Sequence, residues 1–173
     1  MSNEHWFIDE TKAKGFTFAI VAVDGTDVTR CRTAILRIPR RGQSVLHFKK
    51  ESDATRARAL REIGMLPISV TLVVVSTGVP PIESRKRGVE AVAELAKAKS
   101  PRRIVFELDE AALVNDRKWL RAELGPIRVL EYQHVGKGAD PMLWIADAMA
   151  WAVQRGERWR AQVEHLIVEV IEA

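Results

Sequence analysis

Apolar residues occur along the chain in short runs separated by turn residues, and these runs predict strands. The first runs are bounded by turn signals at Gly15 and at Asp24-Gly25, as expected for a sheet that begins antiparallel. The run at 68–75 is almost entirely apolar and β-branched, which is typical of a central strand covered on both faces. The strands that this pattern predicts are 6–9, 16–23, 32–38, 44–49, 68–75, 103–108 and 127–132.

Apolar positions at helical spacing predict helices from residue 53 onward. Ser52 is a favourable N-cap for the first helix, and Asp140 is the predicted N-cap of a later one, with Pro141 in its first turn. The predicted helices are 53–63, 84–100, 117–124, 141–156 and 157–173.

The last predicted helix, residues 157–173, has an apolar face that needs a partner. We expect this face to pack on the domain or to form the contact of a homo-oligomer. Its residues are Trp159, Val163, Leu166 and Val170.

The order of these elements indicates the fold. Early antiparallel strands, then helix, strand, helix, strand and a late helix form the element order of a ribonuclease H-like domain. We therefore predict an α/β fold, with a mixed sheet of antiparallel first strands and later parallel strands, flanked by helices. A chain of 173 residues with 47% hydrophobic content and no Gly/Ser-rich linker is expected to form one domain, residues 1–173.

The composition limits the cellular locations in which we expect the protein. A single cysteine, Cys31, excludes a disulfide framework, and residues 1–10 lack the basic and apolar stretch of a secretory signal. No run reaches the roughly 18 apolar residues of a membrane span. We expect a cytoplasmic location and no membrane partner.

Basic residues are concentrated in segments of the chain. The formal net charge is +4, yet residues 30–61 hold ten basic residues and two acidic ones. Arginine is well suited to binding phosphate, so nucleic acid is the expected partner. The alternative is a solvated basic surface with no dedicated ligand. The residues expected to contact nucleic acid are Arg40, Arg41, Lys49, Lys50 and Arg56.

Asp147 is the strongest candidate for chemistry. It is the only charged residue between Pro141 and Val153, in a predicted helix that is apolar on every face. A carboxylate there must meet a cation, a metal or strong hydrogen-bond donors. The alternative to a functional role is a buried aspartate satisfied by an arginine or by backbone amides.

Other acids follow predicted strands and can join Asp147. Asp9 and Glu10 end the first strand, and because successive strand residues face opposite sides, only one of them can easily face Asp147. Glu107 interrupts an apolar strand and shares its face with Asp109. Carboxylate oxygens suit Mg²⁺ or Mn²⁺. The predicted metal ligands are Asp9, Glu10, Glu107 and Asp147, with Asp109 and Asp116 as further candidates and an arginine-paired structural role equally open for Glu107.

Two histidines are candidates for catalysis. His47 and His134 can orient a phosphate, bind metal or move a proton, although each also fits a satisfied histidine at a sheet edge. The sequence has no His-x-x-x-His pair or Cys-His cluster, which argues against zinc. The segment Gly136-Lys-Gly138 lacks the spacing of a Walker loop.

Two motifs resemble those of the domain-of-unknown-function family 3800, whose members open with an Asp-Glu-Ser strand end and close with a Leu-Gln-x-Ala-Asp helix. The matching segments are Phe7-Ile-Asp-Glu-Thr11 and Leu143-Trp-Ile-Ala-Asp-Ala-Met-Ala-Trp151, with Leu46-His-Phe48 between them. Thr11 stands where Ser is usual and Trp144 where Gln is usual. The resemblance implies a ribonuclease H-like fold that brings Asp9 and Asp147 together as metal ligands.

These features predict a metal-dependent, nuclease-like protein that cleaves phosphodiesters. Asp9, Glu107, Asp147 and His47 are the predicted catalytic residues, and Mg²⁺ or Mn²⁺ is the predicted cofactor. The alternative is a non-catalytic module with the same fold that binds nucleic acid or protein.

Overall fold

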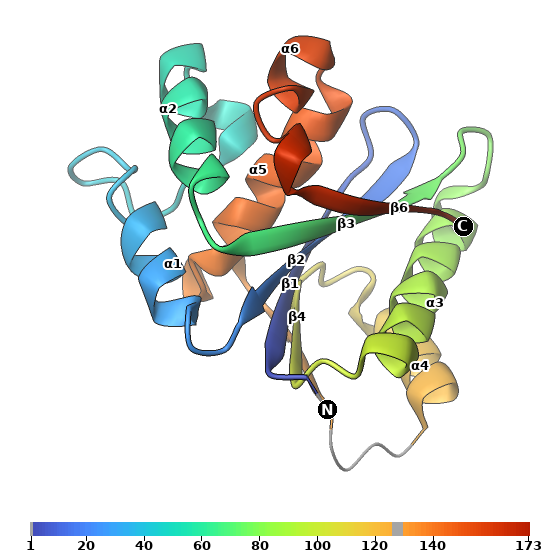
Figure 1. The fold of residues 1–173 in the computed structure, drawn as a ribbon. Coiled ribbons are helices and arrows are strands. Elements are labelled where there is room, and N and C mark those ends of the chain that lie inside the picture. The colour runs from blue at the N-terminus through green and yellow to red at the C-terminus, as the bar shows by residue number, and fades with distance from the viewer. Residues whose placement is uncertain (1, 126–129) are drawn as a thin grey trace.

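The computed structural model describes residues 2–125 and 130–173. Its centre is one mixed sheet in the order β5-β4-β1-β2-β3-β6, covered by helices on both faces (Figure 1). β1, β2 and β3 pair antiparallel, whereas β4, β5 and β6 join in parallel, which confirms the predicted fold class. The strands are β1 (Glu4–Thr11), β2 (Phe16–Asp24), β3 (Ile68–Val75), β4 (Arg103–Glu107), β5 (Glu131–Val135) and β6 (Ile167–Glu172).

The helices divide between the two faces of the sheet. α1, α2, α5 and α6 cover one face, and α3 and α4 cover the other (Figure 1). The helices are α1 (Val28–Ile35), α2 (Asp53–Gly64), α3 (Pro81–Lys99), α4 (Leu113–Leu124), α5 (Met142–Gln154) and α6 (Glu157–Arg160), with short 3-10 turns η1 (Phe48–Lys50), η2 (Lys137–Ala139) and η3 (Glu164–Leu166).

The structure confirms the predicted N-cap Ser52 of α2 and moves the predicted N-cap of α5 from Asp140 to Pro141. The Ser52 hydroxyl accepts from the Thr55 N–H at the start of α2. At the start of α5, Asp140 Oδ1 accepts from the Met142 N–H at 3.0 Å, and Arg32 pairs with the same carboxylate. α3 begins three residues before the predicted start, with Pro81 in its first turn, and α4 begins four residues early.

Two predicted strands in the basic region are wrong. Residues 32–38 belong mainly to α1, because Val28, Cys31 and Ile35 are buried at helical spacing. Residues 44–49 form a loop that enters η1, and the third antiparallel strand is instead β3. The predicted strand 127–132 falls partly on 126–129, outside the described residues, and β5 begins at Glu131.

The predicted helix 157–173 is also wrong, and with it the contact of a homo-oligomer through that helix. The chain forms α6 and η3 and then β6, an edge strand parallel to β3. The β-branched run Ile167-Val-Glu-Val-Ile favours a strand, and the open edge of β3 supplies its hydrogen-bond partners. Of the four predicted apolar positions, only Val170 is exposed. Within the described residues, none of the helices combines the length and apolar character that a membrane crossing requires.

Candidate active site

The alternation of side chains along β1 separates its two acids. Phe7 belongs to the core under α5, whereas Ile8 belongs to the core under α3 and α4. Since strand residues alternate between faces, Asp9 follows Phe7 toward α5 and Glu10 follows Ile8 toward α3. β4 follows the same rule: Val105 lies in the α5 core, and Glu107 therefore lies on the same face as Asp9. At this end of the sheet, side chains from both faces line one polar cleft.

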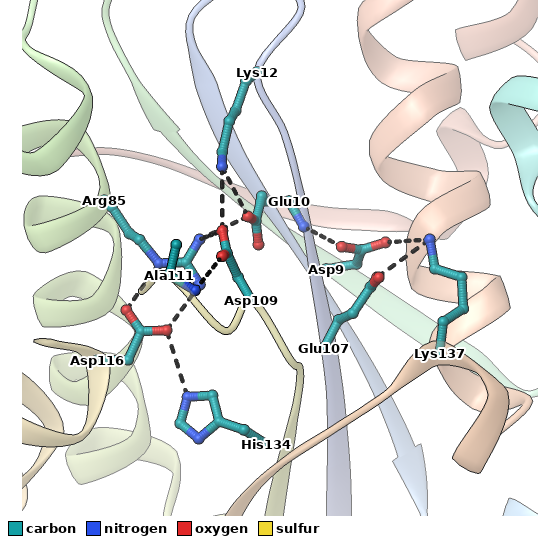
Figure 2. A network of polar contacts seen from close by, with 10 residues as sticks. All are labelled: Asp9, Glu10, Lys12, Arg85, Glu107, Asp109, Ala111, Asp116, His134 and Lys137. Atoms are coloured by element: carbon teal, nitrogen blue, oxygen red, sulfur yellow. Dashed lines mark hydrogen bonds and ion pairs between the residues drawn. The ribbon is translucent and has the colours of Figure 1, made fainter. Parts of the chain in front are cut away.

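Three carboxylates on the α5 side converge on one lysine. Lys137 Nζ lies 3.5 Å from Asp9 Oδ2, 3.2 Å from Glu107 Oε2 and 3.2 Å from Asp147 Oδ2. Figure 2 shows Asp9 and Glu107 pointing toward this ammonium group. The acids come from β1, β4 and α5. The fold thus brings together the three acids that are predicted from the sequence to be catalytic.

Asp147 and Lys137 are held by further hydrogen bonds. Asp147 Oδ2 accepts from the Phe48 backbone N–H at 3.0 Å. The Trp144 indole, one turn earlier on α5, donates to the Lys137 carbonyl at 2.9 Å. Among the described residues, the partners of Asp147 are thus a backbone amide and a lysine, with no arginine.

The electrostatics of this group follow from its negative charge and its burial. Burial raises the pKa of Asp9 well above its ordinary value; a hydrogen bond with Glu107 and the charges of Glu107 and Asp147 raise it further, against the opposing charge of Lys137. Burial lowers the pKa of Lys137, but the three carboxylates outweigh it and the net pKa is raised. The ammonium group is therefore charged and neutralises part of the acidic cluster.

The donor set suits a hard divalent cation, but Lys137 lies between the donors. Among residues 2–125 and 130–173, no three acidic, histidine or cysteine side chains are placed closely enough to hold a metal. The three acids nevertheless supply only carboxylate oxygens, which Mg²⁺ and Mn²⁺ prefer. Glu107 Oε2 is buried, and Lys137 Nζ lies 3.2 Å from it. The chemistry of the three acids therefore suits a divalent cation, but their present spacing around the lysine does not hold one.

A second acidic cluster surrounds Arg85 on the α3 side, and Glu10 belongs to it. Arg85 donates to Glu10 at 2.6 Å and forms two hydrogen bonds of 2.8 Å with the Asp116 carboxylate. Asp109 lies 3.7 Å from Arg85, and Lys12 contacts both Asp109 and Glu10 (Figure 2). The structure thus does not bring Glu10, a predicted metal ligand, to the three acids around Lys137.

Close packing of α3 on the sheet positions Arg85. A Cβ at Gly88 would lie 2.9 Å from the rings of Phe16 and Phe18, so glycine lets the helix approach β2. The Arg85 guanidinium in turn lies 5.7 Å from the centre of the Phe18 ring. Its side chain is only 7% exposed.

The two candidate histidines have different surroundings. His134 on β5 stacks on Phe106, with ring centres 5.0 Å apart, and its Nε2 lies 3.5 Å from Asp116. It therefore belongs to the Arg85 cluster. His47 is half-buried and directly precedes Phe48, whose N–H binds Asp147. In this segment it is Lys49, and not His47, that lines the cleft.

Acid should weaken the Arg85 cluster through Asp116. Burial raises the pKa of Asp116, but hydrogen bonds and charge from Arg85 and His134 outweigh it, and the net pKa lies below the ordinary value of 3.8. The unfolded chain then takes up the proton first as pH falls, so this contribution to stability is complete above about pH 4 and is lost below it.

We expect the free energy of unfolding of the wild type to fall between pH 5 and pH 3 more steeply than that of Asp116→Asn. Urea unfolding at both pH values measures the difference. Glu62→Gln, at an exposed residue of α2, is the control and should keep the wild-type slope. Equal slopes for wild type and Asp116→Asn would contradict the assignment.

The cleft between the clusters has a volume of about 710 Å³. Its walls carry the acids of both clusters, the Trp151 side chain and a set of basic residues. The basic residues lining it are Lys12, Lys49, Lys137 and Arg155. Arg155 also lies over the Trp151 ring, 5.4 Å from its centre, and was not foreseen because it follows the apolar helix as a single exposed arginine.

The residues predicted to bind nucleic acid lie in different parts of the structure. Lys49 lines the cleft and Lys50 is exposed beside it. Arg40 and Arg41 are exposed in the loop after α1, and Arg40 lies 3.9 Å from Glu51.

The Arg56 side chain binds the backbone of η1. Its Nε donates to the Phe48 carbonyl at 2.9 Å and its Nη2 to the Lys49 carbonyl at 2.7 Å. Its Nη1 pairs with Asp53, and its guanidinium lies 4.6 Å from the centre of the Trp151 ring. Arg56 therefore holds η1, the turn that presents the Phe48 N–H to Asp147.

Comparison with known proteins identifies the fold and nothing finer. No family model and no curated protein matches the chain, so the resemblance to family 3800 stays a prediction. Solved structures match most of its length. RNase HII from Archaeoglobus fulgidus, solved in a complex with PCNA, is 18% identical, with a TM-score of 0.61 over 93% of this chain and 77% of that chain.

Two further structures agree. Ribonuclease H2 from Pyrococcus horikoshii is 13% identical, with a TM-score of 0.53 over 94% of this chain and 75% of its own. Bst-RNase HIII in complex with Mn²⁺ is 16% identical, with a TM-score of 0.52; 88% of this chain matches 52% of that one, so the chain spans about half its length. The chain has the ribonuclease H-like fold.

Proposed function

We propose that the protein is a metal-dependent nuclease-like enzyme that hydrolyses phosphodiester bonds of nucleic acid. The observation that carries the proposal is the convergence of Asp9, Glu107 and Asp147, from three separate elements, on one point of an open cleft. The ribonuclease H-like fold and the Mn²⁺ complex of one structural neighbour support it. Asp9 and Asp147 are also the motif acids of the resemblance to family 3800.

Asp9, Glu107 and Asp147 would hold Mg²⁺ or Mn²⁺. A bound divalent cation supplies Lewis-acid stabilisation of phosphate oxygens and a more acidic water. The Phe48 N–H fixes the orientation of the Asp147 carboxylate, and burial raises the pKa of the Asp9 carboxyl beside Glu107. Lys49 and Arg155 line the cleft and would bind phosphates of the nucleic acid, whereas Lys12 is paired with Glu10 and Asp109.

Cleavage of labelled oligonucleotides tests the proposal. Single-stranded DNA, single-stranded RNA, duplex DNA and an RNA–DNA hybrid are each incubated with protein and Mg²⁺ or Mn²⁺. We expect cleavage of at least one of them, lost on addition of EDTA and restored by excess metal. If all four substrates stay intact with either metal, the proposed activity is wrong.

A non-catalytic binding module is the second candidate, and Lys137 is the observation that favours it. One ammonium group already neutralises part of the acidic cluster, so the fold does not require a metal for stability. Under this alternative, Mn²⁺ should leave the melting temperature unchanged both with and without bound oligonucleotide. A metal-dependent rise in melting temperature favours the enzyme.

Nucleic-acid binding should depend strongly on salt because basic residues of the cleft would displace counterions from phosphates. We expect the affinity to fall as a power of salt concentration, and Lys49→Gln and Arg155→Gln each to reduce the slope by about one. Fluorescence anisotropy over a salt series measures this. Arg87→Gln, an exposed residue of α3 paired with Glu83, is the control and should keep the wild-type slope.

A further inference from the structure

Lys137 occupies the position that a divalent cation would need. Its Nζ lies within 3.5 Å of one oxygen of each of the three carboxylates. A divalent cation held by these carboxylates would need shorter contacts, of about 2.1 Å, so the acids would have to close around it after the ammonium group has left. An ammonium group and a divalent cation cannot share this position, because both are positive and both need the same lone pairs.

The placement of this lysine is built into the fold. Its side chain is only 14% exposed, and its backbone is fixed through the hydrogen bond from Trp144 of α5. Trp144, which binds the Lys137 backbone, and Asp147, one of the three acids, both lie on α5. The helix therefore holds the lysine backbone and this acid together. The side chain has four rotatable bonds, so its ammonium can leave the acids while the backbone stays in place.

A displaced ammonium group needs another anion. The remainder of the cleft offers Glu10, Asp109 and Glu110. Arg85 and Lys12 already bind the first two carboxylates, and Glu110 is exposed to solvent. A phosphate group entering the cleft is a free anion of the required charge. Binding of nucleic acid would therefore draw the lysine away and leave the acids to the metal.

We infer that Lys137 is a tethered cation that competes with the divalent metal for Asp9, Glu107 and Asp147 and is released by nucleic-acid phosphate, so that metal and nucleic acid bind cooperatively. The inference rests on the proposed function and deepens it, since it concerns how the same site is loaded. Without nucleic acid the site prefers its own lysine. This arrangement limits metal binding to the complex with substrate.

Mn²⁺ binding tests this independently of cleavage. Free Mn²⁺ is measured from its electron paramagnetic resonance signal with wild type, Lys137→Met and Lys12→Met, each with and without oligonucleotide. The oligonucleotide is a phosphorothioate form of whichever of the four nucleic acids binds the wild type most tightly. Lys12→Met is the matched control, because it removes the same charge from the same cleft without touching the three acids.

The expected result has two parts. Lys137→Met binds Mn²⁺ about tenfold or more tightly than wild type in the absence of oligonucleotide, while Lys12→Met stays near the wild-type affinity. The oligonucleotide tightens Mn²⁺ binding to wild type by a similar factor and has little effect on Lys137→Met. Lys137→Gln, which keeps a hydrogen-bond donor, repeats the measurement if the methionine variant does not fold.

The contrary results separate the two proposals. Equal Mn²⁺ affinities of the folded Lys137 variant and wild type would overturn the competition while leaving the metal site intact. A wild-type affinity unchanged by bound oligonucleotide would overturn the release by phosphate. If neither wild type nor the Lys137 variants bind Mn²⁺ under any condition, the proposed metal-dependent function itself fails.

Discussion

Replacing Arg85 with methionine is expected to lower the free energy of unfolding by about 3–5 kcal/mol, the largest stability effect that the structure predicts for a single charged residue. Arg85 is the common partner of Glu10 and Asp116, and its side chain is 7% exposed. Methionine keeps much of the volume over the Phe18 ring but leaves Asp116 without its arginine and Glu10 with Lys12 alone. An uncompensated buried charge costs more than the pair itself contributes.

Urea unfolding near neutral pH measures this loss. Arg87→Met is the matched control: it lies two residues further on α3, its side chain is 46% exposed, and its ion pair with Glu83 is expected to contribute less than about 1 kcal/mol. Combining Arg85→Met with Asp116→Leu removes both buried charges of the closest pair and should recover part of the lost stability. A single variant as stable as Arg87→Met would show that Arg85 is not required to neutralise the cluster.

Asp147→Asn is expected to reduce phosphodiester cleavage at least a hundredfold, because a ligand of a catalytic cation contributes several kcal/mol to stabilisation of the transition state. The asparagine oxygen can still accept from the Phe48 N–H, and Lys137 keeps its contacts with Asp9 and Glu107. The change in the free energy of unfolding should therefore stay within about 1 kcal/mol. Initial rates under saturating Mn²⁺, together with urea unfolding, measure both quantities.

Asp27→Asn, at the start of α1, is the control for this charge change and should keep wild-type rates. Asp9→Asn should behave like Asp147→Asn, since both contact Lys137 at the same point. A cleavage rate retained in both variants would rule out the carboxylates as metal ligands and leave the binding module as the better hypothesis. A large loss of stability in Asp147→Asn would instead assign the residue a structural role.

Some features of the site could be predicted because they depend on local pattern. Asp147 is isolated among apolar residues, and a charge in that setting must have a partner whatever the rest of the fold. The alternation of β1 likewise predicts that only one of Asp9 and Glu10 faces Asp147, and the structure shows that it is Asp9. Glu107 was one of several acids near the end of its strand, and its position in the alternation of β4 places it beside Asp9.

Other features could not be predicted because their partners are distant in the chain. Arg85 meets Asp116, 31 residues later, and Glu10, 75 residues earlier. Nothing in the segments around these residues distinguishes them from a solvated helix face or turn. Lys137 has no local signal either, since its neighbours Gly136 and Gly138 only indicate a loop.

The sequence by itself determined the strand and helix order of most of the sheet, the start of α5 and the isolation of Asp147, because hydrophobic period and capping act over a few residues. It did not determine the secondary structure of residues 32–38 or 157–173. The short β-branched or mixed segments there fit the apolar pattern of a helix as well as that of a strand. Only tertiary structure decided these, through the open edge of β3 and the core under α5. It also decided which charges pair, because burial makes an unpaired charge costly and the fold alone determines which opposite charge lies within reach.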